Sequence, residues 1–231
     1  MIVSADMDLF FSHLFIIKKL QRDAFRKYAK FLNGRLLDIG CGNSPYRKLI
    51  SCQSYMGIDG LPDVKPDVAA RCESIPCKEK RFDAVICTEL LEHLPEPEKA
   101  LKEIKRVLKE GGYLYLTVPQ SWCLHYEPDD YFRFTKYGIK YLLEKNGFEI
   151  RAVERIGGLF SMIGQRLMDL FWQLMVNCLS VICTLKWSER IASSLTFPGS
   201  VLFYCAAKLG DEIDKKDALG WSILARIKKD N

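Results

Sequence analysis

The sequence is poor in histidine and has no closely paired cysteines. Only 3 histidines occur in 231 residues, and none of the 9 cysteines belongs to a Cys-x-x-Cys pair. These absences argue against a zinc site, and a chain of this length does not need a disulfide scaffold. Asp6 and Asp8 precede the first apolar run, which is unlike a secretory signal. We therefore expect a cytoplasmic protein with reduced cysteines and no metal.

An excess of charge of one sign is also missing. The 34 basic and 29 acidic side chains give a formal net charge of +5, without a long basic run. This mild balance gives no reason to expect nucleic acid as a partner. The length suits a single α/β domain with an accessory piece.

A glycine turn follows the first apolar run of the central part of the chain. Leu36–Ile39 is typical of a buried parallel strand. It stops at Gly40-Cys41-Gly42, where two glycines allow a sharp turn. Asn43 or Ser44 is expected to cap a helix with Pro45 at its first position. A strand, a turn and a helix N-terminus would together form a pocket lined by backbone donors.

An acidic residue follows the next predicted strand, Ser54–Ile58. Asp59 lies about 20 residues after Asp38, the distance at which an acid faces ribose hydroxyl groups in a βαβ unit. A dinucleotide site would have a third glycine where Pro45 stands. Asp38 also places a carboxylate where phosphate charge would lie. This carboxylate suits a ligand that carries an ammonium and a sulfonium group.

These residues resemble motif I of the class I S-adenosylmethionine-dependent methyltransferases. Phe82–Cys87 resembles the family's fourth strand, Thr88–Leu94 the segment after it, and Leu108–Leu114 the loop and fifth strand. The resemblance covers roughly residues 35–155. It implies an α/β, doubly wound, mostly parallel seven-stranded sheet with an antiparallel last strand. It also implies S-adenosylmethionine as cofactor and S-adenosylhomocysteine as product.

The resemblance assigns the cofactor to ten residues near the ends of the first four strands. They are Asp38, Gly40, Cys41, Gly42, Asp59, Gly60, Cys72, Glu73, Thr88 and Glu89. Asp67–Pro76 resembles the family's third strand and the loop that meets adenine. Arg71 stands where the family usually has an acid, and arginine cannot accept a hydrogen bond. Either backbone groups around Arg71 and Cys72 or the Glu73 carboxylate would then contact adenine.

The loop over residues 120–135 is the predicted acceptor side. Loops at the carboxyl end of strands commonly carry function, and a hydroxyl acceptor benefits from a base. His125 can act as that base near neutral pH, with Glu127, Asp129 or Asp130 to orient it or to act instead. Alternatively, Asp129, Asp130 and Arg133 pair only to fix the loop.

Glu92 and His93 form a second candidate acid/base pair. A histidine in a leucine-rich helical turn is, however, more often structural. The sequence therefore leaves both readings of His93 open.

The segment Asp130–Thr135, with the helix expected at Tyr137–Lys145 and Asn146-Gly147-Phe148 after it, resembles methyltransferases of cell-envelope glycan and lipid pathways. We expect methyl transfer to a hydroxyl, or to a carboxyl or amine, of a glycan-related, lipid-linked or other small-molecule acceptor. The alternatives are an inactive S-adenosylmethionine-binding scaffold at a membrane complex and a nicotinamide-dependent reductase.

The chain is divided by this resemblance into segments of one methyltransferase domain, residues 1–231. They are an N-terminal helix cap (1–34, with a helix over 7–31), a cofactor-binding core (35–155), an apolar helical insertion between strands six and seven (156–200), a last strand (201–208) and a C-terminal tail (209–231). We expect helices at 7–31 and 96–110, the second ending at Gly111-Gly112, and the N-terminal helix and the insertion to cover the substrate.

The insertion contains an uncharged run, residues 170–185. As a helix it would rise about 24 Å, short of the ~20 residues that span a bilayer. A polar stripe marks one side of it: Asp169, Gln173, Asn177, Ser180 and Thr184. Residues 159–186 could contact the inner face of a membrane peripherally, form a homodimer, cover a lipidic substrate or pack as plain core.

Overall fold

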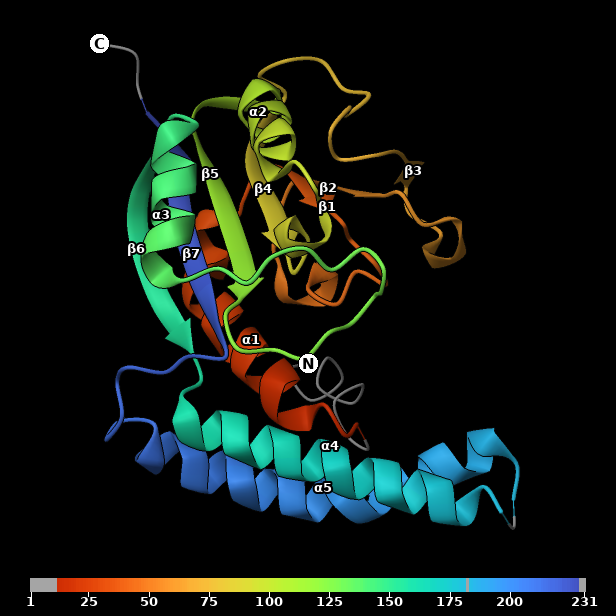
Figure 1. Ribbon diagram of the computed structural model, residues 1–231. Helices are drawn as coiled ribbons and strands as arrows, with labels where there is room; N and C mark the ends of the chain where they lie inside the picture. The colour runs from red at the N-terminus through yellow and green to blue at the C-terminus, as the bar shows by residue number, and fades with distance from the viewer. Residues whose placement is uncertain (1–11, 182, 229–231) are drawn as a thin grey trace. The chain divides into compact units, whose positions relative to one another are not determined.

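A seven-stranded sheet carries the larger part of the chain (Figure 1). The computed structural model describes residues 12–181 and 183–228. The strands lie in the order β3-β2-β1-β4-β5-β7-β6. Their bounds are β1 Arg35–Ile39, β2 Ser54–Asp59, β3 Val68–Ala69, β4 Phe82–Thr88, β5 Leu108–Pro119, β6 Phe148–Ile156 and β7 Gly220–Ile227. Strands β1 to β5 pair in parallel and β7 is antiparallel to β5, which confirms the predicted fold class.

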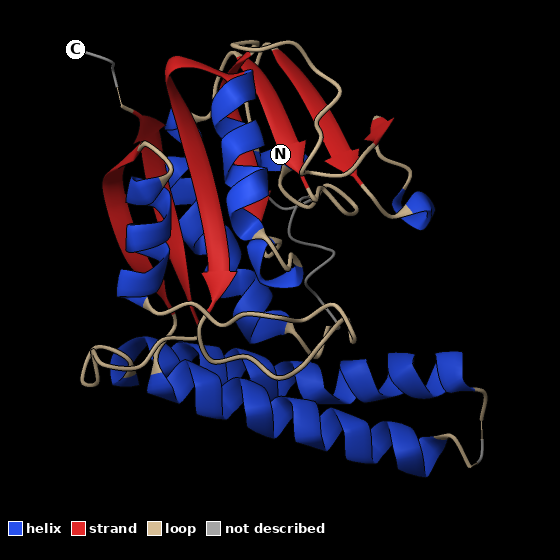
Figure 2. Ribbon diagram, turned by 45° about the horizontal axis from the view of Figure 1, so that its top comes forward, coloured by secondary structure: helices blue, strands red, loops and turns tan. Residues whose placement is uncertain are grey.

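Helices cover both faces of this sheet. On one face the central strands contribute alternate side chains to a core with Phe25, Tyr28 and Leu32, which lie at and after the C-terminal end of α1 (Phe15–Tyr28). The strand residues of this core are Leu36, Ala84, Ile86, Tyr115 and Leu224. Figure 2 shows α2 (Pro97–Val107) and α3 (Lys136–Lys145) on the other face. The helix α2 buries residues at helical spacing, namely Ala100, Leu101, Ile104 and Val107.

The helix predicted directly after the glycine turn does not form. Ser44 has φ +52°, a left-handed backbone conformation that cannot continue into an α-helix. Only a short 3₁₀ helix, Arg47–Leu49, follows before β2. The turn therefore lacks the helix N-terminus that the sequence predicted beside the ligand.

The helix predicted over 96–110 ends at Val107, and β5 begins at the next residue. The two glycines lie inside this strand instead of ending the helix. Gly111 has φ +72°, and the pairing of β4 with β5 shifts register between Phe82 and Ala84. The glycines thus allow an irregularity in the strand, a role that a helix-stop pattern does not distinguish.

The insertion forms two helices, α4 (Leu159–Leu179) and α5 (Leu185–Gly210), which run side by side as a hairpin (Figure 1). The uncharged run at 170–185 is therefore not one helix, because the chain turns after Leu179.

The last strand predicted at 201–208 is wrong as well, since these residues belong to α5. Within them Tyr204 and Ala207 are buried at helical spacing. The true β7 lies inside the predicted tail, at 220–227.

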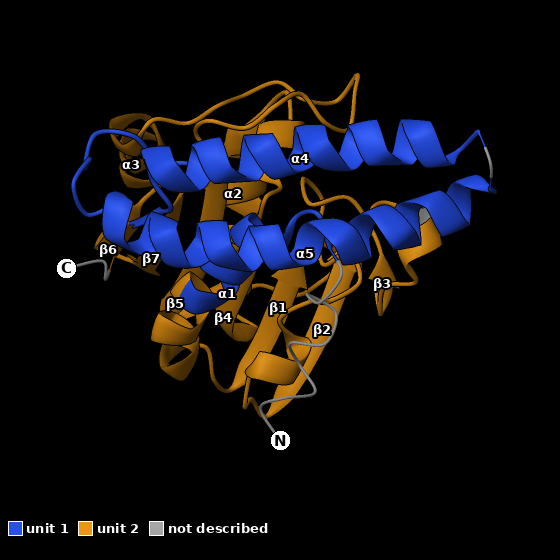
Figure 3. Cartoon of the chain, turned by 90° about the horizontal axis from the view of Figure 1, so that it is seen from below, with its two compact units in different colours: residues 1–23, 155–219 blue, residues 24–154, 220–231 orange. Residues whose placement is uncertain are grey.

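The chain divides into two compact units (Figure 3), and the single methyltransferase domain over residues 1–231 stays a prediction. The first contains residues 1–23 and 155–219, and the second contains residues 24–154 and 220–231. The N-terminal helix is shorter than predicted, because α1 ends at Tyr28 and a 3₁₀ turn covers Ala29–Phe31. The predicted start at residue 7 lies outside the described residues. Within 12–181 and 183–228, no helix is both long and apolar enough to cross a membrane.

Candidate active site

A cavity of about 330 Å³ lies beside the carboxyl ends of β1, β2 and β4. Strand order reverses between β1 and β4, and open α/β sheets bind ligands at such a point. The lining residues come from the loops that follow these strands and from the loop after β5. They are Ile39, Gly40, Asp59, Gly60, Leu61, Ala70, Arg71, Cys72, Glu73, Glu89, Leu90, His93, Leu94, Tyr126 and Asp129.

Gly40 directly follows β1 and lies at the cavity wall. Its φ is +66°, and a Cβ atom at this position would lie 2.9 Å from Cδ1 of Leu90. Both the conformation and the contact therefore require glycine. The backbone N–H groups of Gly40 and Cys41 donate to the carbonyl of Ile58, at 2.8 and 3.1 Å. These two donors are thus used within the protein and do not face a ligand.

Asp59 lies at the end of β2 and lines the cavity. Its Oδ2 accepts a hydrogen bond from the Gly42 N–H at 2.9 Å, and its Oδ1 accepts one from the Leu61 N–H at 2.8 Å. The carboxylate is therefore fixed between the loops that follow β1 and β2. Each oxygen has a second lone pair that can accept a ribose hydroxyl.

Asp38 lies on β1, two residues before Gly40, and does not line the cavity. Its side chain is 1% exposed, and Oδ2 accepts a hydrogen bond from the Tyr55 hydroxyl at 2.5 Å. Oδ1 has no hydrogen-bond partner. Burial, together with the nearby charge of Asp59, raises the pKa of Asp38 to about 7. An unpaired buried acceptor of this kind suits a ligand with a cationic group.

Arg71, Cys72 and Glu73 lie together at the cavity wall near β3. The Arg71 side chain is exposed and pairs with Glu73 at 3.2 Å, and the Cys72 thiol donates to the same carboxylate at 3.3 Å. Burial opposes ionisation of Glu73, but the hydrogen bonds from Arg71, the backbone and Cys72, together with the charge of Arg71, outweigh it and lower the pKa of Glu73. The contact of adenine with either the Glu73 carboxylate or the backbone around Arg71 and Cys72 remains a prediction.

The remaining predicted cofactor residues occupy different positions. Gly60 and Glu89 line the cavity, whereas Cys41, Gly42 and Thr88 do not. The Cys41 thiol is packed against β2, since a Cβ atom on Gly57 would lie 2.9 Å from its Sγ. Glu89 has φ +48°, and burial raises the pKa of its carboxyl group.

Arg133 fixes the loop over 120–135. It forms two parallel bonds of 2.7 Å to the carboxylate of Asp130 and donates to the carbonyls of Trp122 and Cys123 at 3.1 and 2.7 Å. The bonds from Arg133 hold the pKa of Asp130 far below its ordinary value. This geometry confirms a structural clamp, with Asp130 as its acid.

The predicted catalytic residues of this loop do not all meet. His125 lies beside Asp130, with 3.3 Å between Nδ1 and Oδ2. Burial lowers the pKa of His125 and thus favours the neutral imidazole. Asp129 lines the cavity and accepts a hydrogen bond from the Tyr131 hydroxyl at 2.8 Å. Glu127 is exposed and lies outside the lining residues.

Several residues of the site had no distinct signal in the sequence. Leu61, Leu90 and Tyr126 line the cavity, and Tyr55 bonds to Asp38 from the neighbouring strand. Tyr126 belongs to the loop over 120–135 that was predicted to form the acceptor side, but no pattern singled it out. Apolar and strand residues look like ordinary core until the fold places them.

Comparisons with known proteins point to one family. Residues 37–116 match the family model described as "Methyltransferase domain". A ubiquinone biosynthesis O-methyltransferase of Alkalilimnicola ehrlichii is 31% identical over 127 residues, which are 48% of this chain and 49% of the relative. One of Pseudomonas aeruginosa is 26% identical over 156 residues, 60% of this chain and 65% of the relative. The chain thus spans about half to two thirds of these relatives.

Solved structures show the same fold at low identity. A SAM-dependent methyltransferase from Archaeoglobus fulgidus has a TM-score of 0.56 at 17% identity and covers 90% of this chain and 94% of its own. The [4+2]-cyclase SpnF has a TM-score of 0.57 at 21% identity and covers 92% and 81%. The phosphoethanolamine N-methyltransferase 2 of Haemonchus contortus in complex with S-adenosyl-L-methionine has a TM-score of 0.56 at 19% identity, over 90% and 53%.

Proposed function

We propose that this chain, whose central part is a class I S-adenosylmethionine-dependent methyltransferase domain, transfers a methyl group to a hydroxyl group of a small-molecule or lipid-linked acceptor. The observation that carries this proposal is the cavity beside β1, β2 and β4 with Asp59 fixed at its wall. The named relatives are O-methyltransferases, which favours an oxygen acceptor over an amine.

The residues present fit S-adenosylmethionine. Asp59 can accept hydrogen bonds from the ribose hydroxyls, and Gly40 lets Leu90 pack closely against the backbone at the cavity wall, where a Cβ atom would clash with it. The unpaired Oδ1 of Asp38 favours a positively charged group nearby. When bound, the cofactor supplies an electrophilic methyl group on a sulfonium.

The loop after β5 supplies the groups that can accept a proton. As the new carbon–oxygen bond forms and the carbon–sulfur bond breaks, the acceptor's hydroxyl proton must pass to a base. His125 and Asp129 are the candidates, and the Arg133 clamp fixes the backbone that carries both. The main contribution of the protein is to hold the hydroxyl and the methyl group in line.

Two alternatives make different predictions. The [4+2]-cyclase SpnF has the same fold, so the fold alone does not establish methyl transfer. Calorimetry with S-adenosylmethionine and with NADH separates the methyltransferase from a reductase: we expect binding of the first only.

Formation of S-adenosylhomocysteine with catechol and with a polyprenyl-linked sugar as probes separates an enzyme from a scaffold. Binding of NADH alone, or cofactor binding without turnover on any hydroxyl probe, would overturn the proposal.

We also propose that the helical hairpin lies on the surface of a membrane. Large apolar side chains on its two helices are exposed: Phe160, Ile163, Leu167, Leu170, Phe171 and Leu174 on α4, and Leu185, Trp187, Ile191, Leu195, Leu202 and Leu209 on α5. The buried residues of α5 are mostly small or hydroxyl-bearing: Ser188, Ala192, Ser193, Thr196, Ser200, Tyr204, Ala207 and Gly210. In a helix pair that is surrounded by water, the large apolar side chains are instead buried between the helices and the polar ones are exposed.

Close contacts between the two helices involve these small residues. The Trp172 indole donates to the Ser193 hydroxyl at 3.0 Å. A Cβ atom on Gly210 would lie 2.4 Å from the Phe160 ring, so the helices approach too closely there for any side chain. Small residues at helix contacts and large apolar residues outside are typical of helices in an apolar environment.

The charge of the hairpin favours an anionic lipid surface. Its basic residues outnumber its acidic ones by 4 to 2: Arg166, Lys186, Arg190 and Lys208 against Asp169 and Glu189. Since neither helix qualifies as a membrane span, a position in the interface is the arrangement that satisfies the exposed apolar side chains.

Vesicle flotation tests this proposal. We expect the protein to float with phosphatidylglycerol-containing vesicles more than with phosphatidylcholine vesicles. Leu174→Glu and Leu195→Glu should abolish flotation, whereas Asn177→Glu, an exposed polar position of α4, serves as matched control and should weaken it less. Flotation that is absent or unaffected by the leucine variants would overturn the proposal. A dimer in light scattering that the same variants dissociate would assign the surface to a second copy instead.

A further inference from the structure

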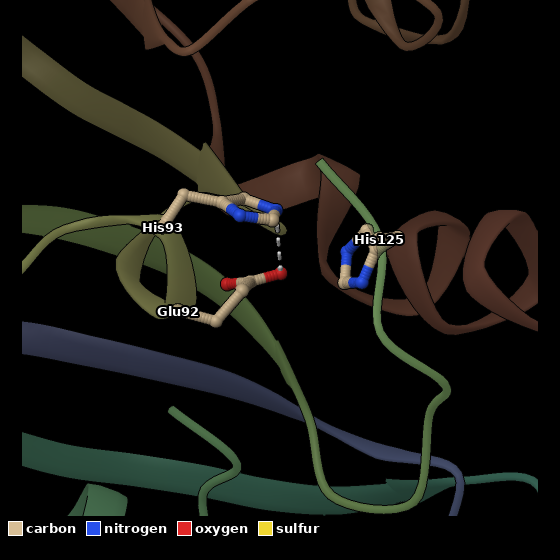
Figure 4. Close-up of side chains that lie close together, drawn as sticks. All are labelled: Glu92, His93 and His125. Atoms are coloured by element: carbon tan, nitrogen blue, oxygen red, sulfur yellow. Dashed lines mark ion pairs between the residues drawn. The ribbon is translucent and has the colours of Figure 1, made fainter. Parts of the chain in front are cut away.

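Three side chains converge beside the cavity from two loops (Figure 4). Glu92 and His93 lie on the 3₁₀ turn Leu91–His93 after β4, and His125 lies on the loop after β5. One ligand atom from each of the three side chains lies within 4.8 Å of the other two. Because β4 and β5 are adjacent parallel strands, their following loops meet at one edge of the sheet. We call these three residues the Glu-His-His cluster.

Glu92 is the unusual member of the cluster. Its side chain is 0% exposed, and neither carboxylate oxygen has a hydrogen-bond partner. Its Oε1 lies 3.8 Å from Nε2 of His93, which is too long for a hydrogen bond. Burial raises the pKa of Glu92, because a buried carboxylate without a hydrogen-bond partner is costly, and a bound cation would remove this cost.

Both histidines are oriented with Nε2 available. Nδ1 of His93 lies 2.6 Å from the carbonyl oxygen of Asp129, and Nδ1 of His125 lies 3.1 Å from that of Cys123. A carbonyl oxygen only accepts, so in the neutral imidazoles Nδ1 carries the proton and Nε2 the lone pair. Histidines that bind metals are held in this way by a partner on the other nitrogen. The Arg133 clamp further fixes the Cys123 carbonyl, at 2.7 Å.

We propose that Glu92, His93 and His125 bind one zinc ion. Two imidazoles and a carboxylate are a ligand set that zinc accepts, and three protein ligands leave a fourth position for another oxygen. His93 also lines the cavity, so that the open position lies beside it. The small number of histidines argued against a metal, but the fold brings two of the three together.

The role of this ion rests on the proposed function. An acceptor hydroxyl in the open position would have a lowered pKa, because a metal ion stabilises the oxyanion. A carboxylate such as that of Asp129, which lines the same cavity, can then take the proton. His125 acts here as a ligand and not as the base.

Metal binding can be measured without cofactor or acceptor. After treatment with a chelator and its removal, the full chain should bind one zinc ion per chain in calorimetry. Cobalt(II) in its place should give the visible absorption of a four-coordinate site. Glu92→Gln and His125→Gln should each weaken zinc binding about tenfold or more. His13→Gln changes the one histidine outside the cluster and should leave binding unchanged.

The outcomes separate the two proposals. No zinc binding, or binding that the Glu92→Gln and His125→Gln variants retain while still binding S-adenosylmethionine, would overturn the metal site alone. Methyl transfer that persists in chelator would also count against it. Zinc binding lost in both variants, in a chain that forms no S-adenosylhomocysteine with any probe, would support the site and overturn the proposed function.

Discussion

The Tyr55 hydroxyl donates a hydrogen bond of 2.5 Å to Oδ2 of Asp38, from β2 to the neighbouring β1. This contact satisfies one oxygen of a carboxylate whose other oxygen has no partner. Burial raises the pKa of Asp38 to about 7, so this carboxyl group is close to half protonated at neutral pH. A cationic ligand would favour the ionised form and would therefore bind more weakly as pH falls.

The first prediction concerns pH and stability. The pKa of Asp38 is raised on folding, so the folded state binds more protons than the unfolded state between the ordinary aspartate value of about 4 and about 7. The free energy of unfolding should therefore fall as pH rises through this window, by a few kcal/mol at most. Asp38→Asn should remove that fall. Urea denaturation of both proteins at about pH 5 and pH 8 measures the difference, and parallel pH profiles would contradict it.

The second prediction concerns Asp59. Asp59→Ala removes the acceptor of the Gly42 and Leu61 N–H groups as well as the proposed ribose contact. Hydrogen bonds to a charged group contribute about 1.5–3 kcal/mol, so the affinity for S-adenosylmethionine should fall about ten- to hundredfold. Calorimetry measures this loss, and Asp63→Ala, an exposed acid on the next turn, is the matched control. If the two variants bind S-adenosylmethionine with equal affinity, the ribose does not contact Asp59.

Local pattern was sufficient for the elements around the cavity. The apolar run Leu36–Ile39 and the glycines after it carry their own signal, because a buried parallel strand and a positive φ each restrict the residue types allowed. The short helix-like stretch after Pro45 was misread, since a cap pattern does not reveal the left-handed Ser44. The fold and part of the cofactor side could therefore be predicted from sequence.

The elements and contacts that depend on distant parts of the chain could not be predicted from local sequence pattern. Residues 201–208 and 220–227 are both short apolar runs, and periodicity alone does not tell a buried strand from a buried helix segment. Their identities depend on the pairing of β7 with β5 and of α5 with α4. The Glu-His-His cluster likewise depends on two loops meeting in space, so the sequence could pair Glu92 with its neighbour His93 but could not add His125 to them.

The third prediction concerns the loop clamp. Arg133→Lys keeps the charge but loses the paired bonds to Asp130 and the bonds to the two carbonyls, because an ammonium group is not a planar fork. We expect the melting temperature to fall slightly and the turnover number to fall about tenfold, with cofactor affinity nearly unchanged. Arg151→Lys, an exposed pair with Glu149 on β6, is the matched control. If both variants turn over alike, the clamp does not position the acceptor side.

The fourth prediction uses two glycines of the same turn. Both Gly40 and Gly42 have positive φ, at +66° and +49°, so alanine should cost each about 1–2 kcal/mol of backbone strain. Only at Gly40 does the new Cβ atom meet a neighbour, Leu90, at 2.9 Å, whereas at Gly42 nothing lies within 4 Å. Gly40→Ala should therefore be the more destabilised variant. It should also lose more affinity for S-adenosylmethionine, because Leu90 lines the cavity and its displacement changes the shape of the cavity wall.

The double variant Gly40→Ala/Leu90→Ala separates the cost of backbone strain at position 40 from the cost of the contact with Leu90. Removing the Leu90 side chain relieves the contact but not the strain, so the stability difference between the alanine variants at positions 40 and 42 should shrink in the Leu90→Ala background. Chemical denaturation and calorimetry with S-adenosylmethionine give both quantities. If the difference persists unchanged in that background, then backbone strain alone explains the need for glycine, and Leu90 does not shape the wall of the site.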